Sequence, residues 1–202
     1  PYTTLFRSSC LFDHSGTIIS VLGNGNVPEK QSRRIFFAAF PNKMTQKKLT
    51  RKAEEIQAMC GGRVIKAHHI HLTLLFLGDT DMDRIDTLLE TMKKISVKRF
   101  ELELNKISYW KHNQIVFAGA SHYPDELFVL VESLKNSLTE AGFLFDNRNY
   151  KPHITLIRKA FRPIDNQPMK PVLWSIGQWH LVQSKSGPEG ADYISLAHWP
   201  LK

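Results

Sequence analysis

Two four-residue segments place a histidine and a threonine at the same spacing in different parts of the chain. Side chains alternate between the two faces of a strand, so this spacing predicts that each histidine lies beside its threonine while the apolar residues between them face a core. Two such strands facing each other would bring two imidazoles and two hydroxyls into one site. The segments, called here the first and second tetrad, are His71-Leu72-Thr73-Leu74 and His153-Ile154-Thr155-Leu156.

Paired imidazoles suit the hydrolysis of a phosphate ester. Histidine titrates near neutral pH, so one imidazole can take a proton from the attacking water while the other protonates the departing oxygen. The hydroxyls of Thr73 and Thr155 can donate hydrogen bonds to the non-bridging phosphate oxygens, whose charge grows in the transition state. The tetrads therefore predict acid/base catalysis that uses no metal and no cofactor.

The surroundings of the tetrads repeat as well. Apolar runs at 35–40 and 115–120 each precede a helical pattern and then a tetrad. Phe37 precedes His71 by 34 residues and Phe117 precedes His153 by 36 residues. A duplicated strand-helix-strand unit is the simplest explanation of this spacing.

The apolar patterns extend this unit to an α+β fold with mainly antiparallel sheets. Three prolines favour a loop over 161–171. Helices are predicted around 49–60, 85–95 and 127–141. Strands are predicted at 34–40, 63–67, 71–77, 100–105, 114–120, 152–158, 174–183 and 193–197.

The chain divides into a leader, 1–32, and one bilobal domain, 33–202. The lobes are expected at about 33–110 and 111–202, with termini that can cross between them. Residues 1–31 show no sustained period, and their opening resembles translated adapter sequence, so we expect them to be partly or wholly non-native. A native mobile leader is the alternative.

Composition places the domain in a broad class. The net charge is +8, and the leader's charges cancel, so a basic domain favours a polyanionic partner such as nucleic acid. Cys10 and Cys60 lack metal-like spacing and indicate no disulfide framework, which fits a reducing cytoplasm. No apolar run is long enough to span a membrane, and we expect a monomer.

The flanks of the tetrads resemble one family. "HLTLLFLGD" and "KPHITLIRKA" are similar to the bacterial and archaeal RNA 2′,3′-cyclic phosphodiesterases, often labelled 2′-5′ RNA ligases, within the two-histidine phosphoesterases. The resemblance covers about residues 33–200. It implies two lobes around a central cleft, and an RNA substrate with a 2′,3′-cyclic phosphate end, tRNA fragments included, that is opened to a 2′-phosphate. It further implies that His71 is the proton donor, His153 the proton acceptor and Arg158 a phosphate-binding residue.

Other interpretations stay open. His68 and His69 could suggest a metal site, but no carboxylate or cysteine accompanies them at ligand spacing, so a solvated strand start is the better explanation. Arg158 could form a rim salt bridge. Ligation or its reversal at 2′-5′ junctions would use the same cleft, while a noncatalytic RNA-binding module or a structural core would not need two titrating groups at mirrored positions. Aromatic residues that could stack on a base, or simply pack, are Phe40, Tyr109, Trp110 and Tyr150.

Overall fold

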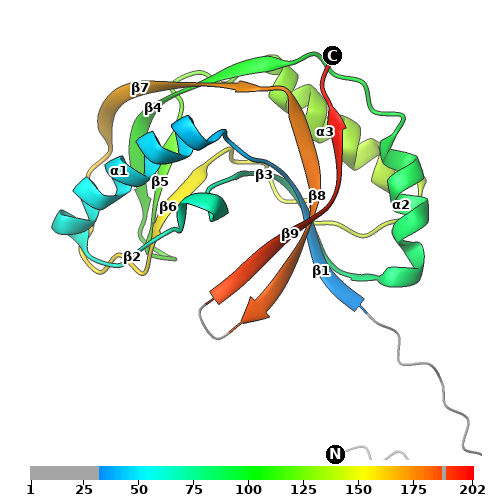
Figure 1. The fold of residues 1–202 in the computed structure, drawn as a ribbon, viewed down its shortest axis with the longest axis horizontal. Helices are drawn as coiled ribbons and strands as arrows, with labels where there is room; N and C mark the ends of the chain where they lie inside the picture. The colour runs from blue at the N-terminus through cyan, green and yellow to red at the C-terminus, as the bar shows by residue number, and fades with distance from the viewer. Residues whose placement is uncertain (1–31, 188–189) are drawn as a thin grey trace, which may run out of the picture. The chain divides into compact units, whose positions relative to one another are not determined.

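Two antiparallel sheets organise the described part of the chain, which is residues 32–187 and 190–202 of a computed structural model (Figure 1). The expectation for residues 1–31 lies outside the described residues. The first sheet has the order β3-β1-β8-β9 and the second has the order β2-β6-β5-β4-β7. The first sheet consists of β1 (Ser32–Ala39), β3 (Leu72–Asp81), β8 (Gln178–Gly187) and β9 (Gly190–Pro200). The second consists of β2 (Arg63–Val64), β4 (Phe100–Trp110), β5 (Ile115–Gly119), β6 (Ile154–Arg158) and β7 (Gln167–Ile176).

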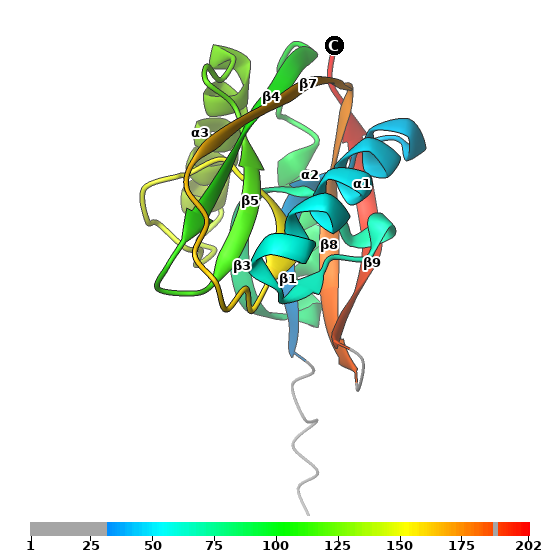
Figure 2. The same cartoon turned by 90° about the vertical axis from the view of Figure 1, so that its left-hand side faces the viewer.

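The helices cross between the sheets. The helix that follows β1 packs on β6 and β7 of the second sheet, and the helix that follows β5 packs on β3 of the first (Figures 1 and 2). Each repeat thus contributes two neighbouring antiparallel strands to one sheet and a helix to the other, which confirms the α+β fold with duplicated strand-helix-strand units. The helices are α1 (Lys43–Cys60), α2 (Ile85–Met92) and α3 (Asp125–Glu140), with short 3-10 helices at η1 (Ala67–His69) and η2 (Met82–Arg84).

The first long helix begins and ends where its sequence requires. The Asn42 side chain accepts a hydrogen bond from the Thr45 backbone N–H at 2.9 Å, so it caps the N-terminus of α1. Gly61 ends the helix at φ +68°, a conformation that costs glycine little. The buried stripe between these ends confirms the predicted helix, and it comprises Leu49, Ala53, Ile56 and Cys60.

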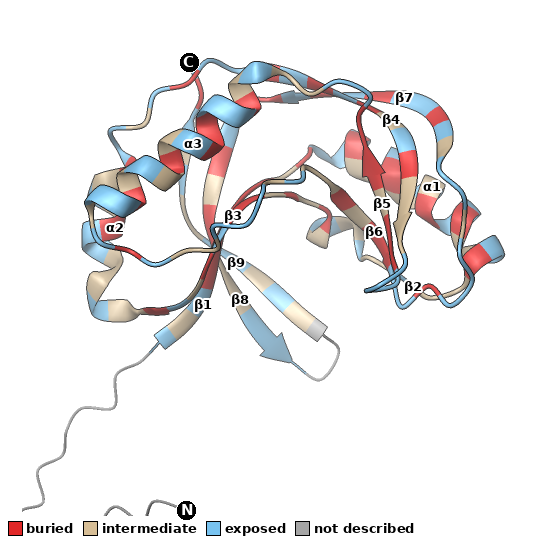
Figure 3. Cartoon of the chain, turned by 180° about the vertical axis from the view of Figure 1, so that it is seen from behind, coloured by how far each residue is buried: buried red, intermediate tan, exposed pale blue. Residues whose placement is uncertain are grey.

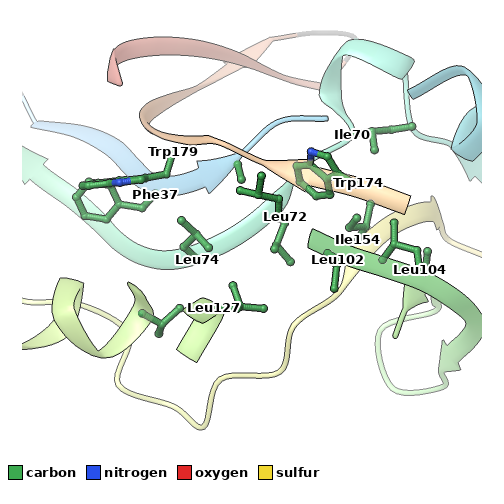
Figure 4. Packing of buried hydrophobic residues seen from close by; sticks show 14 of the residues in the cluster. Phe37, Ile70, Leu72, Leu74, Leu102, Leu104, Leu127, Ile154, Trp174 and Trp179 are labelled. Atoms are coloured by element: carbon green, nitrogen blue, oxygen red, sulfur yellow. The ribbon is translucent and has the colours of Figure 1, made fainter. Parts of the chain in front are cut away.

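The apolar residues of both tetrads belong to one core. Leu72, Leu74 and Ile154 are at most 1% exposed and lie in a single cluster, and Figure 4 shows them beside residues of β4 and β7. Viewed from behind, α3 turns its buried stripe toward the sheets (Figure 3). This packing confirms the alternation that the tetrads predict, and it leaves each histidine and threonine on the opposite face.

Several predicted boundaries are wrong. β3 continues past Gly78 to Asp81, and the predicted strand at 63–67 ends at Val64 before the 3-10 helix η1. The predicted loop 161–171 contains the start of β7, which tolerates its prolines because it is the edge strand of its sheet. The predicted strand 174–183 is two strands, since the chain leaves the second sheet at Gly177 and enters the first.

The sheets do not divide at residue 110. β4 lies in the second sheet, short β2 pairs with β6 there, and the C-terminal strands β8 and β9 complete the first sheet. The lobes predicted at about 33–110 and 111–202 therefore exchange strands, and the exchange involves β2 and β4 as well as the C-terminal strands. Among the described residues, none of the helices combines the length and apolar composition that crossing a membrane requires.

Candidate active site

A cleft of about 1640 Å³ opens between the two tetrads. All five residues that the sequence singles out for catalysis and phosphate binding line it, although they come from two segments that are far apart in the sequence. Its lining includes His71, Thr73, His153, Thr155 and Arg158. The structure therefore brings the predicted site residues together on one surface.

The two histidines are held in the same way. His71 Nδ1 lies 2.7 Å from the His69 carbonyl oxygen, and His153 Nδ1 lies 2.8 Å from the Lys151 carbonyl oxygen. A carbonyl only accepts hydrogen bonds, so Nδ1 carries the hydrogen in both rings and Nε2 is left for a ligand. Each histidine thus bonds to the backbone two residues before it, and the pair presents equivalent nitrogens to the cleft.

Aromatic rings surround both imidazoles. The His71 ring centroid lies 5.0–5.7 Å from those of Phe36, Phe40 and Tyr193. The His153 ring lies 4.5 Å from Trp110. These rings exclude water, which favours the neutral imidazole.

The pKa values of the histidines respond to this burial. The pKa of His71 is lowered to about 4, mainly by loss of solvent; the His69 carbonyl opposes this shift and the nearby Arg158 charge adds to it. Loss of solvent also lowers the pKa of His153, and Arg158 again adds to the effect while the Lys151 carbonyl opposes it. Both shifts favour the neutral imidazole at pH 7.

A bulge in each tetrad strand determines which later residue reaches the cleft. In β6 the register skips Leu156, since Thr155 pairs with Phe117 and Ile157 pairs with the next residue, Val116. The extra residue returns Arg158 to the face of Thr155, whereas regular alternation would turn it away. Arg158 accordingly lines the cleft.

The first tetrad strand contains the matching bulge. In β3 the register skips Leu74, because Thr73 pairs with Ala38 and Leu75 pairs with Phe37. Phe76 therefore lies on the face of Thr73, 42% exposed, at the position that Arg158 occupies in the second copy. The duplicated cleft is thus aromatic on one side and cationic on the other.

The cleft carries an excess of positive charge. Seven cationic side chains line it against two carboxylates, Asp146 and Asp192. Asp146 accepts hydrogen bonds from Arg148 at 2.8 Å, and Asp192 lies 3.5 Å from His69 Nε2. This balance suits an anionic ligand. The cationic residues are Arg34, Arg63, Lys66, Lys135, Arg148, Lys151 and Arg158.

The other candidates differ in what they do. His68 and His69 form the 3-10 helix η1, and the described residues contain no group of three His, Cys, Asp or Glu side chains arranged to hold a metal ion. Phe40 and Trp110 pack against the two catalytic candidates. Tyr109 donates a hydrogen bond to the Ala160 carbonyl at 3.2 Å and is absent from the cleft lining.

Sequence reasoning missed the role of three aromatic residues in the cleft, Phe36, Tyr193 and Phe76. Phe36 and Tyr193 pack against His71, and a short alternation in a closing strand gave no sign of this role. Tyr150, which the sequence offered as a residue that could stack on a base or pack, lines the cleft and donates a hydrogen bond to the Thr73 carbonyl at 3.0 Å, which joins the loop before the second tetrad to the first tetrad. The third missed residue, Phe76, had a signal in the repeat, because it follows Thr73 by three residues as Arg158 follows Thr155.

Comparison with known proteins agrees with this geometry. Residues 40–117 match the LigT-like phosphoesterase family. The chain is 27% identical over 174 residues to the RNA 2′,3′-cyclic phosphodiesterase of Escherichia coli, covering 85% of this chain and 98% of that protein. It is 25% identical over 175 residues to the Thermotoga maritima protein of the same name, covering 81% and 92%. The crystal structure of E. coli LigT complexed with 3′-AMP superimposes with a TM-score of 0.78 at 25% identity, covering 85% of this chain and 99% of that one.

Proposed function

We propose that this chain, which is similar to the LigT-like phosphoesterases, is a phosphoesterase that opens a 2′,3′-cyclic phosphate at the end of an RNA to a 2′-phosphate. The observation that carries the proposal is the matched pair of histidines, each bonded through Nδ1 to a backbone carbonyl and each lining the same cleft. Such a pair can handle two protons at opposite sides of one phosphorus atom.

The proposed reaction balances with these residues alone. His153 Nε2 takes a proton from water, whose oxygen forms a new bond to phosphorus. The bond from phosphorus to the 3′ oxygen breaks, and His71 Nε2–H gives that oxygen its proton. Thr73 and Thr155 donate hydrogen bonds to the non-bridging oxygens, and Arg158 offsets their charge. Because two imidazoles account for both protons, the step requires no metal.

The low pKa of His71 makes catalysis depend on the substrate. A donor must be protonated, yet burial lowers the pKa of His71 to about 4 when no anion lies beside it. The cyclic phosphate brings a negative charge beside the ring, and a nearby opposite charge favours the protonated form. Binding of the anion therefore prepares the donor.

The positive lining supports RNA as the substrate class. Cationic side chains surround the cleft well beyond the two tetrads, and a mononucleotide phosphate alone would not need that many partners. We also propose that the protein acts as a monomer in the cytoplasm, which is compatible with its free, buried Cys60.

The test uses an RNA oligonucleotide that ends in a 2′,3′-cyclic phosphate. We expect a 2′-phosphate as the product, at a rate that EDTA does not lower. A 3′-phosphate would reverse the roles of the two sides of the cleft, and a loss restored by a divalent ion would reject the metal-free step. An added RNA with a 5′-hydroxyl end tests the alternative, since attack by that hydroxyl gives a 2′-5′ joined product.

A further inference from the structure

A second hollow adjoins the cleft on the first sheet. It has a volume of about 470 Å³ and lies where β1 leads into α1 and β7 turns into β8 (Figure 1). Its size falls within the range of small-molecule sites. The lining residues used below are Phe40, Gln178, His180, Tyr193 and Ser195.

The hollow continues the face that carries the first tetrad. His180 pairs with Ala38, which in turn pairs with Thr73, so the three side chains share one face of the sheet. Tyr193 lines both the cleft and the hollow. The Phe40 ring lies 5.7 Å from the His71 ring and 5.3 Å from the His180 ring. A ligand that leaves the cleft past His71 therefore meets the hollow next.

A chain of hydrogen bonds fixes the polar side of the hollow. The Gln178 amide donates to His180 Nε2 at 3.2 Å, which leaves Nδ1 of the same ring to donate to Ser195 Oγ at 2.9 Å. Ser195 Oγ donates onward to the Ala197 carbonyl at 3.4 Å. The amide keeps its oxygen and its second N–H for a ligand.

Two aromatic rings form the other side of the hollow, and one of them is the His180 ring that makes these hydrogen bonds. The Phe40 and His180 ring planes meet at 89°. A flat ligand that stacks on one ring meets the edge of the other. None of the described residues that line the hollow carries a carboxylate, so nothing there repels an anionic chain.

The proposed reaction decides which way the RNA leaves the cleft. His71 protonates the 3′ oxygen of the terminal ribose, so that ribose lies on the side of His71 and water enters on the side of His153. The preceding nucleotides are joined to the same ribose. They must therefore run over the first sheet, where the hollow lies.

We infer that this hollow binds the nucleoside immediately upstream of the cyclic-phosphate nucleotide, with its base stacked at the corner of Phe40 and His180. The Gln178 amide contacts the polar edge of that base. The inference rests on the proposed function and adds a feature to it, because it makes an RNA end a better substrate than a mononucleotide. Stacking of one base on an aromatic side chain is sequence-tolerant, so we expect little preference among the four bases.

Three substrates of increasing length test the inference. They are a nucleoside 2′,3′-cyclic phosphate, the same compound with a 5′-phosphate, and a dinucleotide that ends in the cyclic phosphate. We expect kcat/KM to be about 10-fold higher for the dinucleotide than for the 5′-phosphorylated compound, the lower end of what one stacked base contributes. Equal values for these two substrates would overturn the inference, because they differ only by the upstream nucleoside.

Substitutions then locate the effect. In His180→Ala and Gln178→Ala the dinucleotide's advantage is expected to fall to about 3-fold or less. His122→Ala replaces an exposed histidine of the loop before α3, and the advantage should persist in this control. A full advantage in both hollow variants, with the fold intact by circular dichroism, would place the upstream nucleoside elsewhere.

The outcome separates this inference from the proposed function. If none of the three substrates is opened, the proposed function fails. The inference that the hollow binds a nucleoside is then tested by measuring binding alone. The probes are then the dinucleotide and the 5′-phosphorylated mononucleotide, each with a 2′-phosphate end. A similar Kd for both would reject the hollow as a nucleoside site, whereas a Kd about 10-fold lower for the dinucleotide that is lost in His180→Ala would support it.

Discussion

At the scale of single residues, the two histidines differ in their protein surroundings more than in their hydrogen bonds. Both donate a hydrogen bond from Nδ1–H to a backbone carbonyl. Only His71 is packed by three aromatic rings, those of Phe36, Phe40 and Tyr193. The more enclosed ring has its pKa lowered to about 4. An enclosed imidazole that is protonated only beside an anion is suited to donating a proton at the moment of reaction.

Replacement of the histidines tests their shared role. We expect His71→Ala and His153→Ala each to lower the single-turnover rate by about 100-fold or more, the usual scale for a positioned acid or base. The double variant should lose much less than the product of the two losses, because the groups act as one unit. Single-turnover cleavage of a cyclic-phosphate oligonucleotide measures this, and near-wild-type turnover in either folded variant would remove that histidine from the mechanism.

The pH dependence should shift when substrate binds. In the free enzyme the pKa of His71 is about 4 and that of His153 is lowered too, so kcat/KM should be bell-shaped with its maximum on the acid side of the usual histidine value. The bound anion raises both pKa values, so the kcat profile should lie at higher pH. Coincident profiles, or a kcat profile at lower pH, would show that the phosphate does not charge the donor.

At the scale of elements, one hydrogen bond connects the two tetrads. Tyr150 precedes the second tetrad and donates to the Thr73 carbonyl of the first at 3.0 Å. Tyr150→Phe should lower the free energy of unfolding by about 1 kcal/mol, the value of an ordinary hydrogen bond. It should also lower kcat several-fold with little change in KM, because Thr73 loses a support that fixes its position.

A second tyrosine provides the control. Tyr109 donates to the Ala160 carbonyl at 3.2 Å and does not line the cleft. Tyr109→Phe should cost similar stability, measured by urea denaturation, without a fall in kcat. If the two variants have equal kcat values, the Tyr150 hydroxyl has only a structural role.

The bulge in β6 turns Arg158 toward the cleft, and replacing this residue tests whether it binds the phosphate. Arg158→Met keeps much of the side-chain volume and removes the charge that lines the cleft. Hydrogen bonds to charged groups contribute about 1.5–3 kcal/mol, so KM for the cyclic phosphate should rise about 10-fold or more. Arg162→Met, at an exposed arginine beside Phe161, serves as the control. An equal KM in both variants would assign Arg158 to the rim.

These elements also show what the sequence could predict. The alternation of the tetrads placed Leu72 and Ile154 in the core and the histidines opposite them, because a period of two is local information. The bulges at Leu74 and Leu156 depend on pairing with β1 and β5, so strand alternation alone would turn Phe76 away from the cleft, and only its match to Arg158 in the repeat pointed to it. The proline-rich start of β7 looked like a loop for the same reason, since only the sheet order shows that it is an edge strand.

At the scale of the whole molecule, the described domain begins with β1 at Ser32. Because residues 1–31 show no sustained apolar period and their charges cancel, we expect their deletion to leave the melting temperature and the cyclic phosphodiesterase activity unchanged. Thermal denaturation and turnover of both proteins measure this. A melting temperature that falls by several degrees would mean that the leader packs on the domain.

The exchange of strands between the sheets has a consequence for the making of the protein. β1 and β3 are synthesised early, but β8, the strand that covers the other edge of β1, comes after residue 177. Until it leaves the ribosome, the apolar run at 35–39 has an open edge, which favours pairing with other chains. Tyr193, which encloses His71, arrives later still. A nascent chain that ends before β9 thus holds both tetrads but lacks a ring that encloses His71, so we expect the proposed activity to appear only after β9 has been made.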